Sequence, residues 1–97
     1  MIHLLESILA HVAHHERQEF LARCTPEFAK VAEPQFDKIS NQLAPHLLTG
    51  STLTHLGELK RMNNSVTVFR VAFGDNSDEF VAMISESGGK VSSLVIK

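Results

Sequence analysis

The densest group of residues able to bind a metal lies near the start of the chain. His11, His14 and His15 are close in sequence, and Glu16 lies beside them. On a helix, His11 and His15 are four residues apart and share a face, so their imidazoles could bind one ion. No third, distant ligand is identifiable, and histidines are common on the polar face of an amphipathic helix. We therefore expect no metal site and no other cofactor.

Candidates for acid–base or nucleophilic chemistry are isolated in the sequence. Asp37 could pair with His46 or His55, but nothing in the spacing requires it, and a carboxylate in the first turn of a helix is also favourable for the helix dipole. Cys24 is the only cysteine, and a lone cysteine after a helical run is more often a small buried residue than a nucleophile. The sequence therefore contains no complete catalytic set.

The acidic stretch at residues 75–79 contains possible cation ligands. These are Asp75, Asn76, Asp78 and Glu79. The stretch lacks the glycine and the spaced glutamate of a calcium-binding loop. We interpret it as the hydrated tip of a hairpin.

Arg70 is the most informative charged residue, because it lies in the middle of an apolar strand. A buried arginine without a partner is unfavourable. Its face could be partly hydrated, a carboxylate such as Glu58 could reach it, or it could bind an anionic ligand. We favour pairing with a carboxylate. The candidate ligand-binding residues are accordingly Asp37, His55 and Arg70.

The elements that position these residues centre on three short apolar runs in the last third of the chain. The runs begin at Val66, Phe80 and Val91, and polar turns at 74–78 and 87–90 separate them. Gly88-Gly89 supplies the positive φ of a tight hairpin turn. Because the connections are short, we predict a three-stranded antiparallel meander.

Alternation along these strands gives two apolar faces. The phenylalanine-rich face, with Phe69, Phe73 and Phe80, can be covered by the helices of the chain. The helices are too few to cover the other face as well, and an exposed apolar patch marks an interaction surface. We expect a homodimer formed through this second face. Its interface residues are Val66, Val68, Arg70, Val81, Met83, Val91 and Val95.

The N-terminal half of the sequence reads as helices. Residues 2–14 have helical periodicity, a second short helix contains Phe20, and Thr25-Pro26 is a helix-start signal. The main helix is expected at 34–48, with Pro45 loosening or kinking its last turn. Gly50 then ends it as a left-handed cap.

The stretch that follows the main helix is expected to be a strand at 53–62. Its leucines are spaced by three rather than by two, which a bulge at Gly57 would explain. A turn at 63–65 leads into the meander. The sum is a single α+β domain, with N-terminal helices on one face of a curved four-stranded antiparallel sheet.

The composition excludes some functional classes. The 97 residues carry a net charge of −2, with nine basic residues scattered among eleven acidic ones, so no cationic face for nucleic acid is expected. The N-terminus lacks the basic residues of a signal peptide, and no segment has the length of a membrane helix. We expect a cytoplasmic protein that binds neither nucleic acid nor membranes.

The pattern of segments resembles the nuclear transport factor 2-like superfamily. The similar segments are FLARCTPEF, FDKISNQLAPHL, HLGELKRM, VTVFRVAFGDNSDEFVAMI and GGKVSSLVI. The resemblance covers nearly the whole chain and implies a cystatin-like α+β roll that dimerises sheet to sheet. The isomerase-type enzymes of that superfamily use a tyrosine and an aspartate base. This chain has no tyrosine, so that catalytic set does not carry over.

Two hypotheses about function follow from the sequence. In the first, the protein is a non-enzymatic domain that self-associates and binds a small apolar molecule or a partner between its main helix and its sheet. In the second, it is a small isomerase- or hydrolase-like enzyme with a histidine or aspartate base in that cavity. We favour the first, because no complete catalytic set is readable. The lining of the cavity distinguishes the two.

Overall fold

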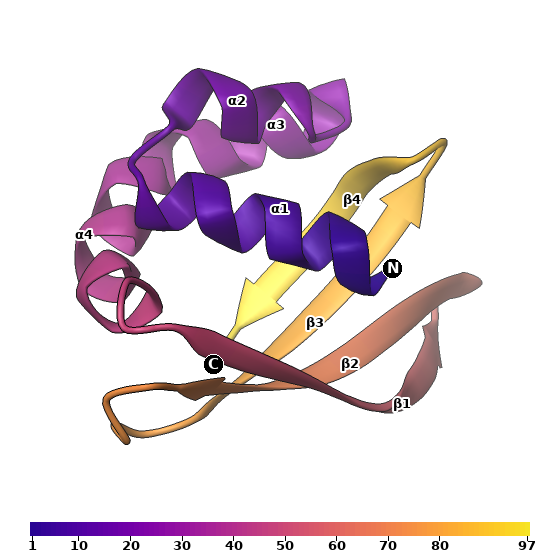
Figure 1. Ribbon diagram of the computed structural model, residues 1–97. Coiled ribbons are helices and arrows are strands. Elements are labelled where there is room, and N and C mark those ends of the chain that lie inside the picture. The colour runs from indigo at the N-terminus through magenta and orange to yellow at the C-terminus, as the bar shows by residue number, and fades with distance from the viewer.

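The computed structural model describes residues 1–97 and shows an α+β chain, with helices in its N-terminal half and strands in its C-terminal half (Figure 1). The elements are α1 (Ile2–Ala13), α2 (Arg17–Ala22), α3 (Pro26–Ala32), the 3-10 turn η1 (Glu33–Gln35), α4 (Phe36–Leu47), β1 (Ser51–Arg61), β2 (Asn64–Phe73), β3 (Phe80–Ser87) and β4 (Lys90–Ile96). This order confirms the predicted α+β class. None of the helices is long and apolar enough to cross a membrane.

The four strands form one antiparallel sheet in the order β1-β2-β3-β4. Gly88 and Gly89 have φ of 60° and 82°, which confirms the predicted tight turn. The register of β1 shifts between His55 and Gly57, so the irregularity expected at Gly57 is present. The first hairpin turns at Met62 and Asn63, one residue earlier than predicted.

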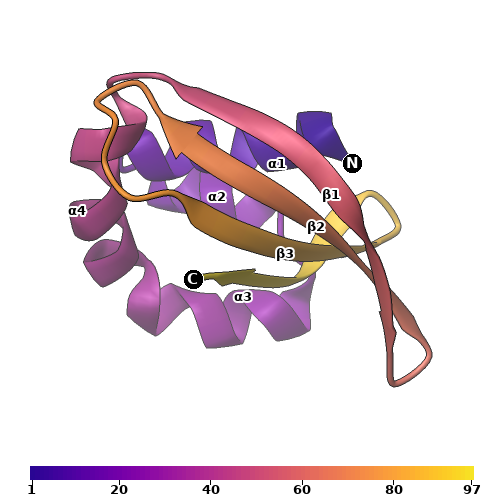
Figure 2. The same ribbon diagram turned by 90° about the horizontal axis from the view of Figure 1, so that it is seen from below.

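Helix α1 provides the most deeply buried helical side chains of the core. It lies along the sheet, and the helices α2, α3 and α4 lie around α1 (Figures 1 and 2). Leu5 and Ile8 are completely buried and belong to one cluster with Phe69 and Ile84 of the sheet. Phe36, the first residue of α4, belongs to the same cluster, and its ring packs at a tilt against Phe20 of α2, with ring centroids 5.0 Å apart.

The main helix begins later than predicted. Pro34 lies in η1, and α4 starts at Phe36 rather than at 34. The helix continues through Pro45 to Leu47, so the proline does not end it. Gly50 follows with φ of 100°, as expected for the residue that terminates the helix.

The prediction that Val91 lies on the second face of the sheet is wrong. The β3–β4 register shifts between Ser85 and Glu86, so that Ser93 pairs with Ser85 but Val91 pairs with Glu86. Ser92 is thus an extra residue, which resets the alternation of side chains. Val91 consequently points into the core, where it is completely buried.

Candidate functional site

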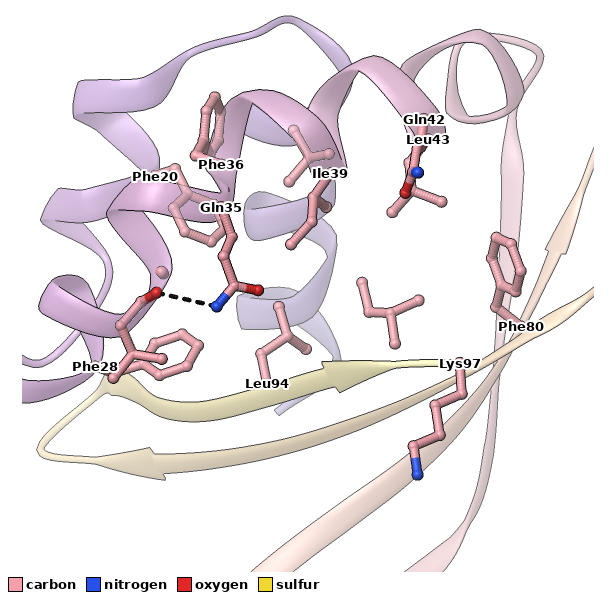
Figure 3. Close-up of a pocket in the computed structure, with 14 residues that line it drawn as sticks. Phe20, Phe28, Gln35, Phe36, Ile39, Gln42, Leu43, Phe80, Leu94 and Lys97 are labelled. Atoms are coloured by element: carbon pink, nitrogen blue, oxygen red, sulfur yellow. Dashed lines mark hydrogen bonds between the residues drawn. The ribbon is translucent and has the colours of Figure 1, made fainter.

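An apolar cleft of about 440 Å³ lies between the helices α3 and α4 and the strands β3 and β4 (Figure 3). Its walls come from elements that are far apart in the sequence. The lining residues are Val12, Phe20, Phe28, Val31, Ala32, Gln35, Phe36, Ile39, Gln42, Leu43, Phe80, Leu94, Ile96 and Lys97. This volume falls within the range of about 300–1,000 Å³ that is usual for small-molecule sites.

Local sequence signals build the helical wall of the cleft. The Thr25 hydroxyl accepts a hydrogen bond from the Phe28 backbone N–H, which caps α3 as the sequence predicts. Helix α3 has no fully buried residue, so Phe28 and Val31 remain available to line the cleft. The short turn η1 then redirects the chain, so that α3 and α4 present side chains to the same space.

Chemically, the cleft is almost entirely hydrophobic. Its polar lining residues are Gln35, Gln42 and Lys97. The Gln35 amide donates a hydrogen bond to the Val31 carbonyl, 3.4 Å away, and its own oxygen receives none. The Lys97 side chain extends away from the centre of the cleft (Figure 3). The cleft is therefore suited to an uncharged, largely apolar molecule, and the free Gln35 oxygen can accept a hydrogen bond from a polar group on it.

A second hollow, of about 630 Å³, lies between α1 and the start of β1. It is more open than the first and has a larger polar share in its lining, including Glu6 and His14. Glu6 contacts His3 at 3.4 Å, where both side chains are exposed. We regard the first cleft as the candidate site, because its walls are apolar and more enclosed.

The three candidate ligand-binding residues are not brought together. Asp37 is exposed and contacts Arg17 of α2 at 3.4 Å. His55 lies edge-on to Phe69, with ring centroids 5.6 Å apart, on the face that carries the core. Arg70 follows Phe69 along β2 and therefore points to the opposite face. None of the three lines the cleft.

The histidine cluster is divided by the end of α1. The helix stops at Ala13, and His15 has φ of 56°, so His11 and His15 do not share a helical face. The Nδ1 atom of His11 is 2.9 Å from the Glu16 carboxylate, whereas Nδ1 of His15 is 2.7 Å from the Ser40 hydroxyl. No three His, Cys, Asp or Glu side chains gather closely enough to hold a metal ion.

Two contacts between serine and histidine were not foreseen from the sequence. Ser40 is completely buried, and its Oγ lies 2.6 Å from the Val12 carbonyl and 2.7 Å from His15 Nδ1. The hydroxyl has a single proton, which the carbonyl must receive, so His15 donates to Ser40. This serine therefore holds the end of α1 and is not an activated nucleophile.

The second contact joins the end of α4 to the β2–β3 loop. His46 Nδ1 lies 2.8 Å from the Asp75 carboxylate and 3.2 Å from the Ser77 hydroxyl. In a nucleophile–base–acid triad, the serine and the carboxylate would address opposite nitrogens of the imidazole. Here both groups contact the same nitrogen, so they cannot form such a triad. The contacts instead hold the loop against the end of α4.

Cys24 is buried, as the sequence indicates. Its thiol donates to the Phe20 carbonyl at 3.3 Å, and burial raises the pKa of the thiol. The backbone on either side of it pairs with β4. Thr25 N–H donates to the Val91 carbonyl, and Val91 N–H donates to the Arg23 carbonyl, both at 2.8 Å.

The outer face of the sheet, defined here as the face opposite Phe69 and Ile84, carries most of the expected interface residues. Val68 pairs with Met83, and Met83 pairs with Val95, so these three form one row across β2, β3 and β4. Val95 is 40% exposed and Val81 is 36% exposed. The corrected candidate surface is therefore Val66, Val68, Arg70, Val81, Met83 and Val95.

Comparison with known proteins gives no significant match to a family model, to a curated protein or to a solved structure. The residues of the cleft and of the outer face are therefore the basis for a functional proposal.

Proposed function

We propose that this protein is a non-enzymatic binding domain that holds an apolar small molecule, or apolar side chains of a partner, in the cleft between α3–α4 and β3–β4. The observation that carries the proposal is the lining of the cleft, in which 11 of the 14 residues are hydrophobic. Pockets of this kind, with a few polar groups at fixed places, are the usual sites for small ligands.

The alternative hypothesis, a small enzyme, requires a histidine or an aspartate in the cavity. No His, Asp, Glu or Cys side chain lines this cleft. The Gln35 and Gln42 amides can orient a ligand but cannot exchange protons with it near neutral pH. This difference favours binding over catalysis.

We further propose that the fold is the cystatin-like roll of the nuclear transport factor 2-like superfamily and that two copies associate through their outer sheet faces. The order of helices and strands supports the first part. The row Val68–Met83–Val95 supports the second, because apolar residues replace the polar ones expected on a hydrated sheet face.

The test of cleft binding is a fluorescence titration with Nile red, an uncharged apolar dye. We expect saturable binding to the parent protein and at least about tenfold weaker binding to Phe28→Asp, which places a charge on the cleft wall. Leu56→Asp is the matched control, because Leu56 is exposed and does not line the cleft. Equal binding by Phe28→Asp and the parent would reject the proposal.

A further inference from the structure

The open edge of β4 runs beside the cleft. Strand β4 is at the end of the sheet, so one of its sides has no neighbouring strand. Val81 and Lys97 exchange two backbone hydrogen bonds, with N–O distances of 2.9 and 3.0 Å. Because alternate residues of an antiparallel strand point their backbone groups to opposite sides, Leu94 and Ile96 direct theirs away from β3.

These outward backbone groups have no partner. No hydrogen bond from a turn, loop or side chain reaches the backbone of Leu94 or Ile96. The side chains of the same two residues line the cleft. The edge therefore offers two donors and two acceptors beside an apolar cavity, which are the two components of peptide recognition by strand addition.

Another segment of the chain already pairs with this edge near the start of β4. At Val91, the segment Arg23–Thr25 lies alongside β4 and forms two backbone hydrogen bonds with it. The segment then leaves the edge, because α3 begins at Pro26. Beyond that point, the row of backbone groups continues without a partner.

Charge distinguishes the possible occupants of this edge. The unpaired part of the edge lies between two basic residues. Arg23 belongs to the segment that covers the edge at Val91, and Lys97 directly follows β4, which itself contains no acidic residue. Two β4 strands paired with each other would bring together like charges. A peptide with acidic ends would complement both Arg23 and Lys97.

We propose that the β4 edge binds an extended peptide segment of a partner protein, with apolar residues at alternate positions and acidic residues at its ends. The peptide would pair with the backbone of Leu94 and Ile96 and place its apolar side chains in the cleft. This inference rests on the proposed function, because it uses the same cleft.

The probe is the peptide Glu-Thr-Val-Thr-Leu-Thr-Glu, acetylated and amidated, and the readout is amide hydrogen exchange followed by NMR. We expect the peptide to slow exchange of the Leu94 and Ile96 amides by at least about tenfold. The same peptide with lysine ends should bind more weakly. Protection of these amides that grows with protein concentration, without peptide, would assign the edge to a second copy and overturn the proposal.

Backbone pairing is tested separately from side-chain binding. N-methylation removes the N–H donor of a peptide residue. Two peptides are compared, one methylated at its apolar positions and one at its threonine positions. Only one of these two sets points its N–H groups to β4, so one methylated peptide should lose binding and the other should keep it. Which set matters reports an antiparallel or a parallel alignment. Equal binding by both methylated peptides would overturn the inference.

A matched pair of protein variants tests the same point. Leu94→Pro and Leu94→Ala both shorten the side chain, but only the proline removes the outward N–H. We expect peptide binding to be much weaker in Leu94→Pro than in Leu94→Ala. Nile red binding without any peptide binding would reject the strand-addition inference alone. Failure of a folded protein to bind either probe would reject the proposed function as well.

Discussion

The Arg70 guanidinium donates two hydrogen bonds to the Glu79 carboxylate, from Nε to Oε1 at 2.8 Å and from Nη2 to Oε2 at 2.6 Å. This two-point contact raises the pKa of Arg70 and lowers the pKa of Glu79. A carboxylate partner for Arg70 was expected, but Glu58 was the wrong one. Glu58 pairs with Thr67 across the sheet, and the register places Thr54 beside Arg70.

The first prediction concerns the polar contact that holds the end of α1. Ser40→Ala should lower the free energy of unfolding by about 1–3 kcal/mol, because the Val12 carbonyl keeps only the longer hydrogen bond from the His15 N–H, at 3.3 Å, and the His15 side chain loses its acceptor. Urea denaturation followed by circular dichroism measures the change. Ser93→Ala is the control, because Ser93 is exposed and forms no side-chain hydrogen bond. Equal effects of the two substitutions would refute this role for Ser40.

The second prediction concerns the close approach of Gly74 to the end of the α4–β1 connection. A Cβ atom at Gly74 would lie 2.2 Å from the Thr49 carbonyl oxygen. Gly74→Ala should therefore lower the free energy of unfolding by about 1–3 kcal/mol, as expected for overpacking. Gly88→Ala is the comparison, because space there is open and only the φ of 60° opposes a side chain. A Gly74→Ala variant with the same melting temperature as the parent would show that the backbone moves to accommodate the Cβ atom, and would contradict this prediction.

The third prediction concerns acid. The Ser77 side chain, His46 and the Ser77 backbone N–H together lower the pKa of Asp75 to about 2. A carboxyl whose pKa is lower in the folded state stabilises the fold above its unfolded value of 3.8, and this contribution is lost as the pH falls towards 2. Asp75→Asn should therefore be less stable than the parent at pH 5, and the difference should shrink towards pH 2.

Urea midpoints at several pH values from 5 to 2 measure this convergence. Asp78→Asn is the matched control in the same loop, because Asp78 forms no side-chain hydrogen bond or ion pair. A difference in stability between Asp75→Asn and the parent that stayed constant with pH would show that ionisation of Asp75 does not cause it.

The order of elements was predictable because it depends on local signals. Thr25-Pro26 begins a helix, Gly88-Gly89 makes a tight turn, and the leucine spacing around Gly57 indicates a bulge. Each signal acts over a few residues, so the sequence contains it directly. The second bulge had the same kind of signal, since Val91 and Leu94 are three residues apart, and alternation alone missed it.

The side-chain partners were not predictable, because they depend on how distant elements pack. His46 and Asp75 are 29 residues apart, and Ser40 and His15 are 25 apart. No spacing rule connects such residues until the helices are placed. The contribution of Phe28 to the cleft was missed for the same reason, because it depends on the turn that η1 makes after α3.

The fourth prediction concerns self-association through the outer face of the sheet. The row Val68–Met83–Val95 lies at the centre of this face, and Val81 extends it beside Arg70. Since Glu79 already neutralises Arg70, a second copy could approach this face without burying an unpaired charge. Pairing of two such faces would bury the apolar row in a two-fold interface.

We therefore expect a dimer in sedimentation equilibrium at micromolar concentration. Val68→Asp combined with Met83→Lys should give a folded monomer, because each side chain places a charge in the buried row. The two new charges have opposite signs and lie on paired residues, so they can form an ion pair within one chain and leave the fold intact. Val31→Asp with Leu48→Lys, on exposed residues of α3 and of the end of α4, is the control and should remain dimeric. A parent protein that sediments as a monomer would contradict the proposal, and so would a dimer that persists in the Val68→Asp, Met83→Lys variant while circular dichroism shows both chains folded.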